Sequence, residues 1–183
     1  DFPLKVCKII HDNIFIDEKT GKYCFKDFYR EETAMARLFE AFVRNFYRIE
    51  QKEFQVYRER IPWDMTTQDS EDILPIMETD ITLKSKNRKI IIDTKYYKEA
   101  LVTRFGNEKF RSENMYQLFS YLKNQEKESD LAKSCEGMLL YPAVKNNFKH
   151  TFQHGEHKIK IASIDLNQEW QSIKENLLSL VEA

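Results

Sequence analysis

Two short apolar segments, residues 76–83 and 89–96, constrain the fold of this chain more than any other feature. Residues 84–88 between them form a polar stretch that predicts a turn, so the pair indicates an antiparallel hairpin. The second segment contains three consecutive isoleucines at 90–92 and is therefore apolar on both faces. That pattern is typical of a strand buried in the middle of a sheet.

Acidic residues and a lysine accompany both predicted strands. Side chains two apart share a face, so we expect Asp93 beside Lys95 and Glu78 beside Asp80. A carboxylate at the end of a buried strand is costly unless a metal ion or a lysine pairs with it. Asp80 and Asp93 would hold Mg²⁺, with the Thr94 carbonyl as a further oxygen ligand. Lys95 would then position or deprotonate a water that attacks a phosphodiester. The alternative is a structural salt bridge, because an Asp-x-Lys pattern alone is common.

Length and composition exclude several classes of protein. The chain has 183 residues, a formal net charge of −1, 32% charged residues and 42% hydrophobic residues. These values predict one folded domain that is neither disordered nor membrane-bound, and we expect a cytoplasmic location. The near-neutral charge gives no overall attraction to DNA, so DNA binding would need a local basic surface. The 3 cysteines are widely spaced and are expected to be free thiols.

The remaining periodicities predict a mixed β-sheet flanked by helices, an α/β (α+β) fold. Apolar residues at helical spacing predict helices at 30–49, 112–128 and 167–181, with Ser112 as the N-cap of the second. Further strands are expected at 53–61, 136–141, 150–153 and 158–164, the last two forming a hairpin. Residues 98–111 are expected to form a long basic loop, and residues 1–28 to be the remainder of a truncated N-terminal region.

Three residues on the predicted helices are candidates for a site. Glu40 interrupts an apolar stretch of the first helix, an uncomfortable place for a carboxylate unless it simply faces solvent. Gln117 and Tyr121 are four residues apart and so lie on one face of the second helix. They would either contact DNA beside the site or form a hydrogen-bonded packing pair.

Basic and histidine side chains are weaker candidates. The predicted basic loop offers phosphate contacts, with a solvated loop as the alternative; its candidates are Lys98, Arg104, Lys109 and Arg111. His154 and His157 flank the predicted hairpin turn but lack further ligands nearby in the sequence. A solvated turn is therefore the favoured interpretation of these two histidines.

Taken together, these residues resemble the PD-(D/E)xK nuclease superfamily, which has a restriction-endonuclease-like fold. The resemblance rests on Asp80, Asp93-Thr94-Lys95, Gln117 and Tyr121. Thr79 stands directly before Asp80, where the superfamily's name has a proline. More closely, the chain from about residue 29 to its end is similar to the McrC family, the endonuclease subunits of McrBC modification-dependent restriction systems. The matching strings are residues 74–82, 91–98, 108–110, 114–118, 137–142 and 168–170.

The resemblance implies a DNA endonuclease domain at 29–183 that depends on Mg²⁺ (or Mn²⁺) and acts within a GTP-dependent complex. It implies Asp80 and Asp93 as metal ligands, Lys95 as the catalytic lysine and Glu40 as an additional ligand or a water contact. The implied partners are an McrB-like AAA+ GTPase hexamer, which binds the GTP, and double-stranded DNA containing methylcytosine. Two nuclease domains would pair on DNA to cut both strands. The alternatives are a non-catalytic scaffold that binds DNA or a GTPase, and a stand-alone nuclease of the same superfamily.

Overall fold

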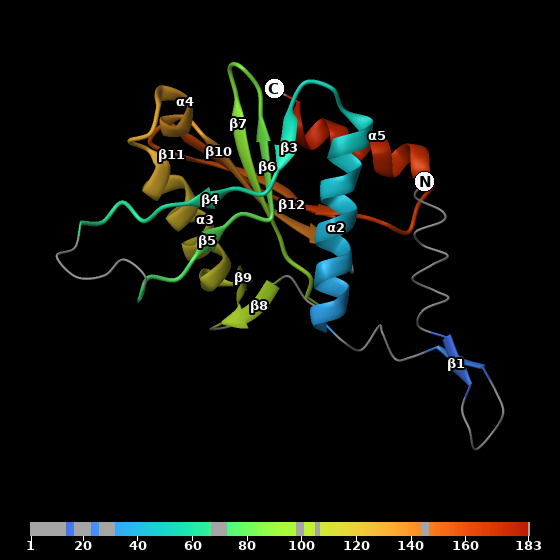
Figure 1. Ribbon diagram of the computed structural model, residues 1–183. Coiled ribbons are helices and arrows are strands. Elements are labelled where there is room, and N and C mark those ends of the chain that lie inside the picture. The colour runs from blue at the N-terminus through green and yellow to red at the C-terminus, as the bar shows by residue number, and fades with distance from the viewer. Residues whose placement is uncertain are drawn as a thin grey trace.

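A six-stranded mixed sheet forms the centre of the computed structural model (Figure 1). The structure describes residues 14–16, 23–25, 32–66, 73–97, 101–104, 107–143 and 147–182. The strand order is β11-β12-β10-β7-β6-β3. These strands are β3 (Gln55–Tyr57), β6 (Ile81–Lys84), β7 (Lys89–Thr94), β10 (Glu136–Pro142), β11 (Lys149–His154) and β12 (His157–Ile164).

The predicted hairpin lies in the middle of this sheet. β7 pairs antiparallel with β6 and parallel with β10, and every residue of β7 is buried. Its three isoleucines contact both faces of the sheet, as their apolar run predicts. The first predicted strand, 76–83, is not continuous. It divides into β5 (Met77–Glu78), which pairs with β4 (Arg60–Ile61), a bend, and β6.

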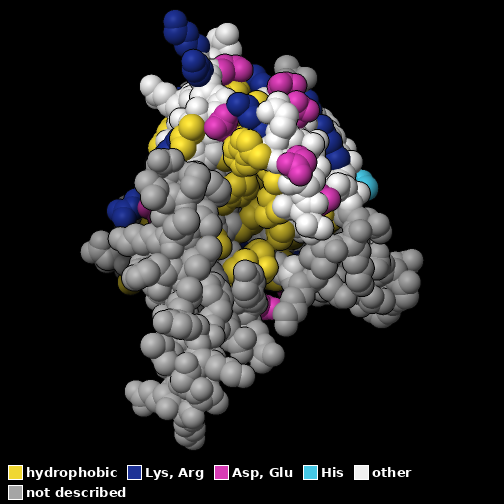
Figure 2. Space-filling model, turned by 90° about the vertical axis from the view of Figure 1, so that its right-hand side faces the viewer, with side chains coloured by type: hydrophobic (Ala, Val, Ile, Leu, Met, Phe, Trp, Pro, Cys, Tyr) yellow, Lys and Arg dark blue, Asp and Glu magenta, His cyan; other side chains and the backbone are white. Residues whose placement is uncertain are grey.

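Helices cover both faces of the sheet. α2 (Glu32–Glu50) and α5 (Trp170–Val181) lie on one face, and α3 (Ser112–Gln125) lies on the other (Figure 1). Hydrophobic side chains gather in the middle of the side of the molecule where α2 and α5 lie (Figure 2). The T-shaped contact of Phe46 with Trp170 joins these two helices. The predicted α/β architecture is therefore confirmed.

Several predicted boundaries change. The long loop predicted at 98–111 is wrong for residues 101–104 and 107–110, because β8 (Leu101–Arg104) and β9 (Asn107–Phe110) pair antiparallel. Ser112 is the first residue of α3, and Arg111 occupies the N-cap without a side-chain capping bond. The short helix α4 (Asp130–Lys133) was not predicted, and β1 (Ile14–Ile16) pairs with β2 (Tyr23–Phe25).

The hairpin of β11 and β12 is confirmed, with Gly155 at a φ of 57° in its turn, a conformation that favours glycine. The favoured interpretation of these histidines as part of a solvated turn is wrong for His157. Its ring is 1% exposed and contacts the Cys135 carbonyl and the Glu126 carboxylate. His154 remains exposed. Among the described helices, none combines the length and apolar character needed to cross a membrane.

Candidate active site

Asp80 lies in the bend between β5 and β6 and faces the end of β7. Its Oδ2 accepts hydrogen bonds from the backbone N–H and the hydroxyl of Thr94, both at 2.8 Å. The antiparallel pairing of β6 with β7 sets this contact, because it places the start of β6 opposite the end of β7. The predicted approach of Asp80 to the Asp93–Lys95 segment is therefore present.

Asp93 is the second carboxylate, and its side chain is fully buried. Lys95 Nζ lies 2.7 Å from Asp93 Oδ2, which confirms the predicted shared face. Apart from this ion pair, neither carboxylate oxygen has a hydrogen-bond partner among the described residues. Burial raises the pKa of the Asp93 carboxyl to about 7; the Lys95 ammonium opposes this rise, and the Asp80 and Glu40 carboxylates add to it. Loss of hydration is therefore the main reason why the ionised form of Asp93 is disfavoured.

Lys95 connects the acidic pair to α3. Its Nζ donates to Gln117 Oε1 at 2.7 Å, and Gln117 Nε2 donates to the Tyr121 hydroxyl at 2.7 Å. Tyr121 in turn donates to the Glu78 carbonyl at 3.0 Å. Gln117 and Tyr121 are thus a hydrogen-bonded pair, one of the two predicted alternatives. The pair orients Lys95 and ties α3 to β5.

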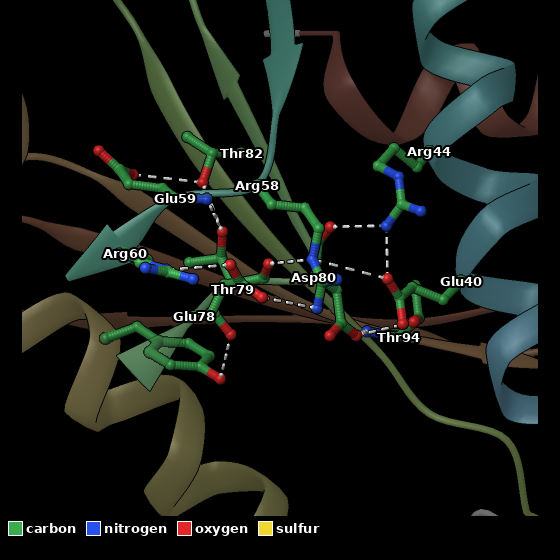
Figure 3. Close-up of polar contacts among 11 residues, drawn as sticks. Glu40, Arg44, Arg58, Glu59, Arg60, Glu78, Thr79, Asp80, Thr82 and Thr94 are labelled. Atoms are coloured by element: carbon green, nitrogen blue, oxygen red, sulfur yellow. Dashed lines mark hydrogen bonds and ion pairs between the residues drawn. The ribbon is translucent and has the colours of Figure 1, made fainter. Parts of the chain in front are cut away.

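Glu40 reaches the same edge of the sheet from α2. Its Oε1 forms an ion pair with Arg44 and lies 3.9 Å from Arg58 Nε (Figure 3). Arg44 Nη1 also donates to the Asp80 carbonyl at 3.4 Å. The Glu40 side chain is only 20% exposed, so the alternative that it simply faces solvent does not hold. Two arginines bind it beside Asp80.

Glu78 does not share the surroundings of Asp80. Its carboxylate pairs with Arg58 Nη2 at 3.1 Å and with Arg60 Nε at 3.5 Å. The expectation that Glu78 and Asp80 lie side by side on one strand fails because the chain bends between them. Lys95 and Arg88 pair with other acids, Lys95 with Asp93 and Arg88 with Glu136, both at 2.7 Å.

A buried polar network fixes the bend that carries Asp80. Thr79 is fully buried, and its hydroxyl lies 2.9 Å from the Thr82 hydroxyl and accepts from the Glu59 N–H at 3.0 Å (Figure 3). The Glu59 carboxylate accepts from Thr82 at 3.2 Å and from Lys89 Nζ at 2.9 Å. Buried polar groups need such partners, so the network stabilises one geometry of the bend.

The predicted phosphate-binding residues are only partly within the described structure. Lys109 is exposed at the end of β9, and the Arg111 guanidinium lies over the Tyr97 ring, 4.5 Å from its centroid. The side chain of Arg104, in β8, and the whole of Lys98 lie outside the described residues. Stacking on Tyr97 gives Arg111 a contact within the protein that the predicted solvated loop did not include.

Arg44, Arg58 and Glu59 are residues at this site that the sequence analysis did not identify. Arg44 is on α2 and Arg58 precedes β4, both far from Asp80 in the sequence. An arginine four residues after Glu40 was the available signal for Arg44, since i and i+4 residues are neighbours on a helix. The position of Arg58 depends on the bend, which no local pattern indicated.

The carboxylates at this edge could hold Mg²⁺, although they do not form a site closed by protein ligands alone. No group of three or more His, Cys, Asp or Glu side chains in the described ranges is arranged to hold a metal ion. Mg²⁺ does not need one, because it keeps several waters and is commonly held by one or two carboxylates and substrate phosphates. Asp80 and the poorly partnered Asp93 meet that requirement.

The sheet, its covering helices and the acids at one strand end have the architecture of the restriction-endonuclease-like class. The chain belongs to the McrBC 5-methylcytosine restriction system component family, which matches residues 5–142. It is similar to the Type IV methyl-directed restriction enzyme EcoKMcrBC of Escherichia coli (strain K12), with 36% identity over 183 residues. That alignment covers 99% of this chain and 52% of the relative, so the chain spans about half the length of the curated relative it matches.

Proposed function

We propose that this chain is the DNA-cutting component of an McrBC-type restriction complex and hydrolyses phosphodiester bonds with Mg²⁺. One observation carries the proposal. Asp93 is a fully buried carboxylate next to Asp80. Among the described residues, its partner is Lys95 alone. A purely structural carboxylate at this depth would need further hydrogen bonds to offset its lost hydration. A cation-binding role explains why those bonds are missing.

Asp80 and Asp93 would hold the metal ion, with the Thr94 carbonyl as a third oxygen. Bound there, Mg²⁺ would supply Lewis-acid stabilisation of the negative charge that develops on the scissile phosphate. The Asp80 carboxylate is already oriented by the Thr94 N–H and hydroxyl, which fix one oxygen and leave the other available. Preorganisation of this kind avoids an ordering cost when the ligand arrives.

Lys95 would act on the attacking water and the phosphate. An ammonium group has three N–H donors. Asp93 and Gln117 take two of them, so one remains for a water or a phosphate oxygen. Gln117 and Tyr121 would hold Lys95 in place, and Glu40 would contact a water at the edge of the site once it leaves its arginine partners.

The proposed partners follow from the family. The E. coli relative is described as a methyl-directed restriction enzyme, and the family description names 5-methylcytosine. We infer that an McrB-like AAA+ GTPase hexamer binds this component and selects double-stranded DNA containing methylcytosine. GTP hydrolysis by that partner would activate cleavage, so the chain alone would cut DNA poorly.

The catalytic assignment is tested by substitutions in the reconstituted complex. Asp80→Ala, Asp93→Ala and Lys95→Ala should each reduce the cleavage of methylated plasmid by at least about 10³-fold, because each removes a group that acts on the transition state. Gel electrophoresis of plasmid products measures the loss. Asp165→Ala, at a half-buried position after β12, is the matched control and should cut at the wild-type rate. Normal cleavage by Asp93→Ala would exclude the proposed site.

A non-catalytic scaffold is the second candidate. It is favoured by the existing Lys95–Asp93 ion pair, which already gives the buried carboxylate a partner. Calorimetric titration with Mn²⁺ or Ca²⁺ separates the two. An active site should bind the ion, and Asp80→Asn should weaken that binding; a scaffold should bind none. GTP-independent cutting by the isolated chain would instead indicate a stand-alone nuclease.

A further inference from the structure

The basic side chains around the acidic edge differ in their availability to a ligand. Lys95 donates to Asp93 and Gln117, and Arg44, 19% exposed, binds Glu40 and the Asp80 carbonyl. The Arg58 side chain is 45% exposed, although it also reaches the site. Its Nε lies 3.9 Å from Glu40 and 3.4 Å from the carbonyl of Thr79, the residue before Asp80. Arg58 is thus both adjacent to the acids and accessible to DNA.

We propose that Arg58 binds a DNA phosphate next to the metal site, and that Glu78 competes with this phosphate for the same guanidinium. The inference rests on the proposed function and adds a substrate-binding residue to it. A guanidinium presents five N–H donors in a planar fork that matches two phosphate oxygens. Arg58 uses Nε and Nη2 toward the protein (Figure 3), which leaves Nη1 for a phosphate oxygen, and Nη2 would join it once Glu78 is displaced.

The exchange of Glu78 for phosphate costs little. The Arg58–Glu78 pair is partly exposed, at 45% and 33%, and such ion pairs contribute little to stability because solvent screens them. Glu78 keeps Arg60 as a second partner 3.5 Å away, so it is not left unpaired when Arg58 turns to DNA. Arg58 would meanwhile keep its contact with the Thr79 carbonyl, which fixes the guanidinium beside Asp80.

The test measures DNA binding by the full-length chain without cleavage. A fluorescein-labelled duplex is titrated by anisotropy in Ca²⁺, over a series of salt concentrations. Arg58→Gln should weaken binding about tenfold or more, as expected for a hydrogen-bonded ion pair with phosphate. It should also reduce the slope of log Kd against log salt by about 0.9, the value for one phosphate contact. Arg58→Lys keeps the charge and should keep most of the slope.

Two matched variants separate this role from a structural one. Arg60, whose side chain is 74% exposed, is the other partner of Glu78. Arg60→Gln should change the salt slope by less than half as much as Arg58→Gln does. Glu78→Gln should tighten binding severalfold, a direction that a folding defect cannot produce. This gain should disappear in the Glu78→Gln/Arg58→Gln double variant.

An unchanged slope in Arg58→Gln, or an equal gain from Glu78→Gln in both backgrounds, would overturn the inference. Neither outcome depends on catalysis. Cleavage that survives Asp93→Ala contradicts the proposed function, whereas an unchanged Arg58→Gln slope with cleavage still lost in Asp93→Ala contradicts only the role of Arg58.

Discussion

Asp93 shows the physical cost of burying a carboxylate with few partners. Its carboxylate is fully buried, one ammonium group neutralises it, and neither of its oxygens accepts a regular hydrogen bond among the described residues. Burial raises its pKa to about 7, which means that the ionised form is poorly stabilised inside the fold. Functional sites commonly retain such locally unfavourable groups because the ligand compensates them.

We therefore expect a divalent cation to stabilise the folded chain. At a Mg²⁺ or Ca²⁺ concentration about 100 times the Kd, linkage predicts about 2.7 kcal/mol, or roughly 5–10 °C in Tm for a chain of this size. Differential scanning calorimetry with and without EDTA measures the shift. Asp93→Asn should abolish the shift while being at least as stable as the wild type in EDTA, because it removes a buried charge. An equal shift in Asp93→Asn would show that the ion binds elsewhere.

The bend between β5 and β6 is the element that directs Asp80 toward β7. Its geometry depends on Thr79, whose N–H donates to the Glu59 carbonyl at 2.9 Å while its hydroxyl accepts from the Glu59 N–H. Lys89, 3% exposed at the start of β7, binds the Glu59 carboxylate and Gln125 of α3. The bend is thus joined to the central strand and to α3 through buried polar groups.

Thr79→Val should loosen this bend without changing the size of the side chain. It leaves the Glu59 N–H without its acceptor, which should lower the free energy of unfolding by about 1–3 kcal/mol in urea denaturation. Cleavage by the reconstituted complex should fall as well, because Asp80 loses its fixed position. Thr79→Ser retains the hydroxyl and serves as the control, with a smaller loss of stability. If Thr79→Val cuts and unfolds as the wild type does, the network does not position Asp80.

The whole molecule assembles one site from both faces of its sheet. α2 supplies Glu40 and Arg44, the central hairpin supplies Asp93 and Lys95, and α3 supplies Gln117. These elements meet at one edge, and each site has a single acidic pair. Under the proposed function, one such site would hydrolyse one strand at a time, so cutting both strands of a duplex would require two copies of the chain.

Mixed complexes test this requirement. When wild-type and Asp93→Ala chains are combined in equal amounts with the partner, many pairs will contain one functional site. We expect nicked circular plasmid to accumulate at the expense of linear product, measured by agarose gel over time. The control is wild-type chain diluted to half its concentration without the variant. If the mixture only slows linearisation without nicking, a single copy cuts both strands.

Local patterns predicted much of this structure. The apolar run 90–92 indicated a buried central strand, and the polar residues 84–88 indicated its hairpin turn. The helix from 30–49 and the shared face of Asp93 and Lys95 follow from periods of 3.6 and 2, which the backbone imposes on any chain. Gln117 and Tyr121 followed from the same helical spacing.

The predictions that were wrong concern features that depend on contacts between distant segments. Residues 98–111 contain no clear alternation, yet 101–104 and 107–110 within this range pair as β8 and β9. His157 lies next to a turn but is buried by Cys135 and Glu126 from other elements.

The sequence alone determined the central strand, its acids and its lysine, because these depend on spacing along one segment. Tertiary structure decided the bend at Thr79, the binding of Glu40 by two arginines and the partner of Glu78. Those arrangements arise where α2, β4, β5 and β7 converge. Buried polar groups there must find partners, and those partners lie far away in the sequence.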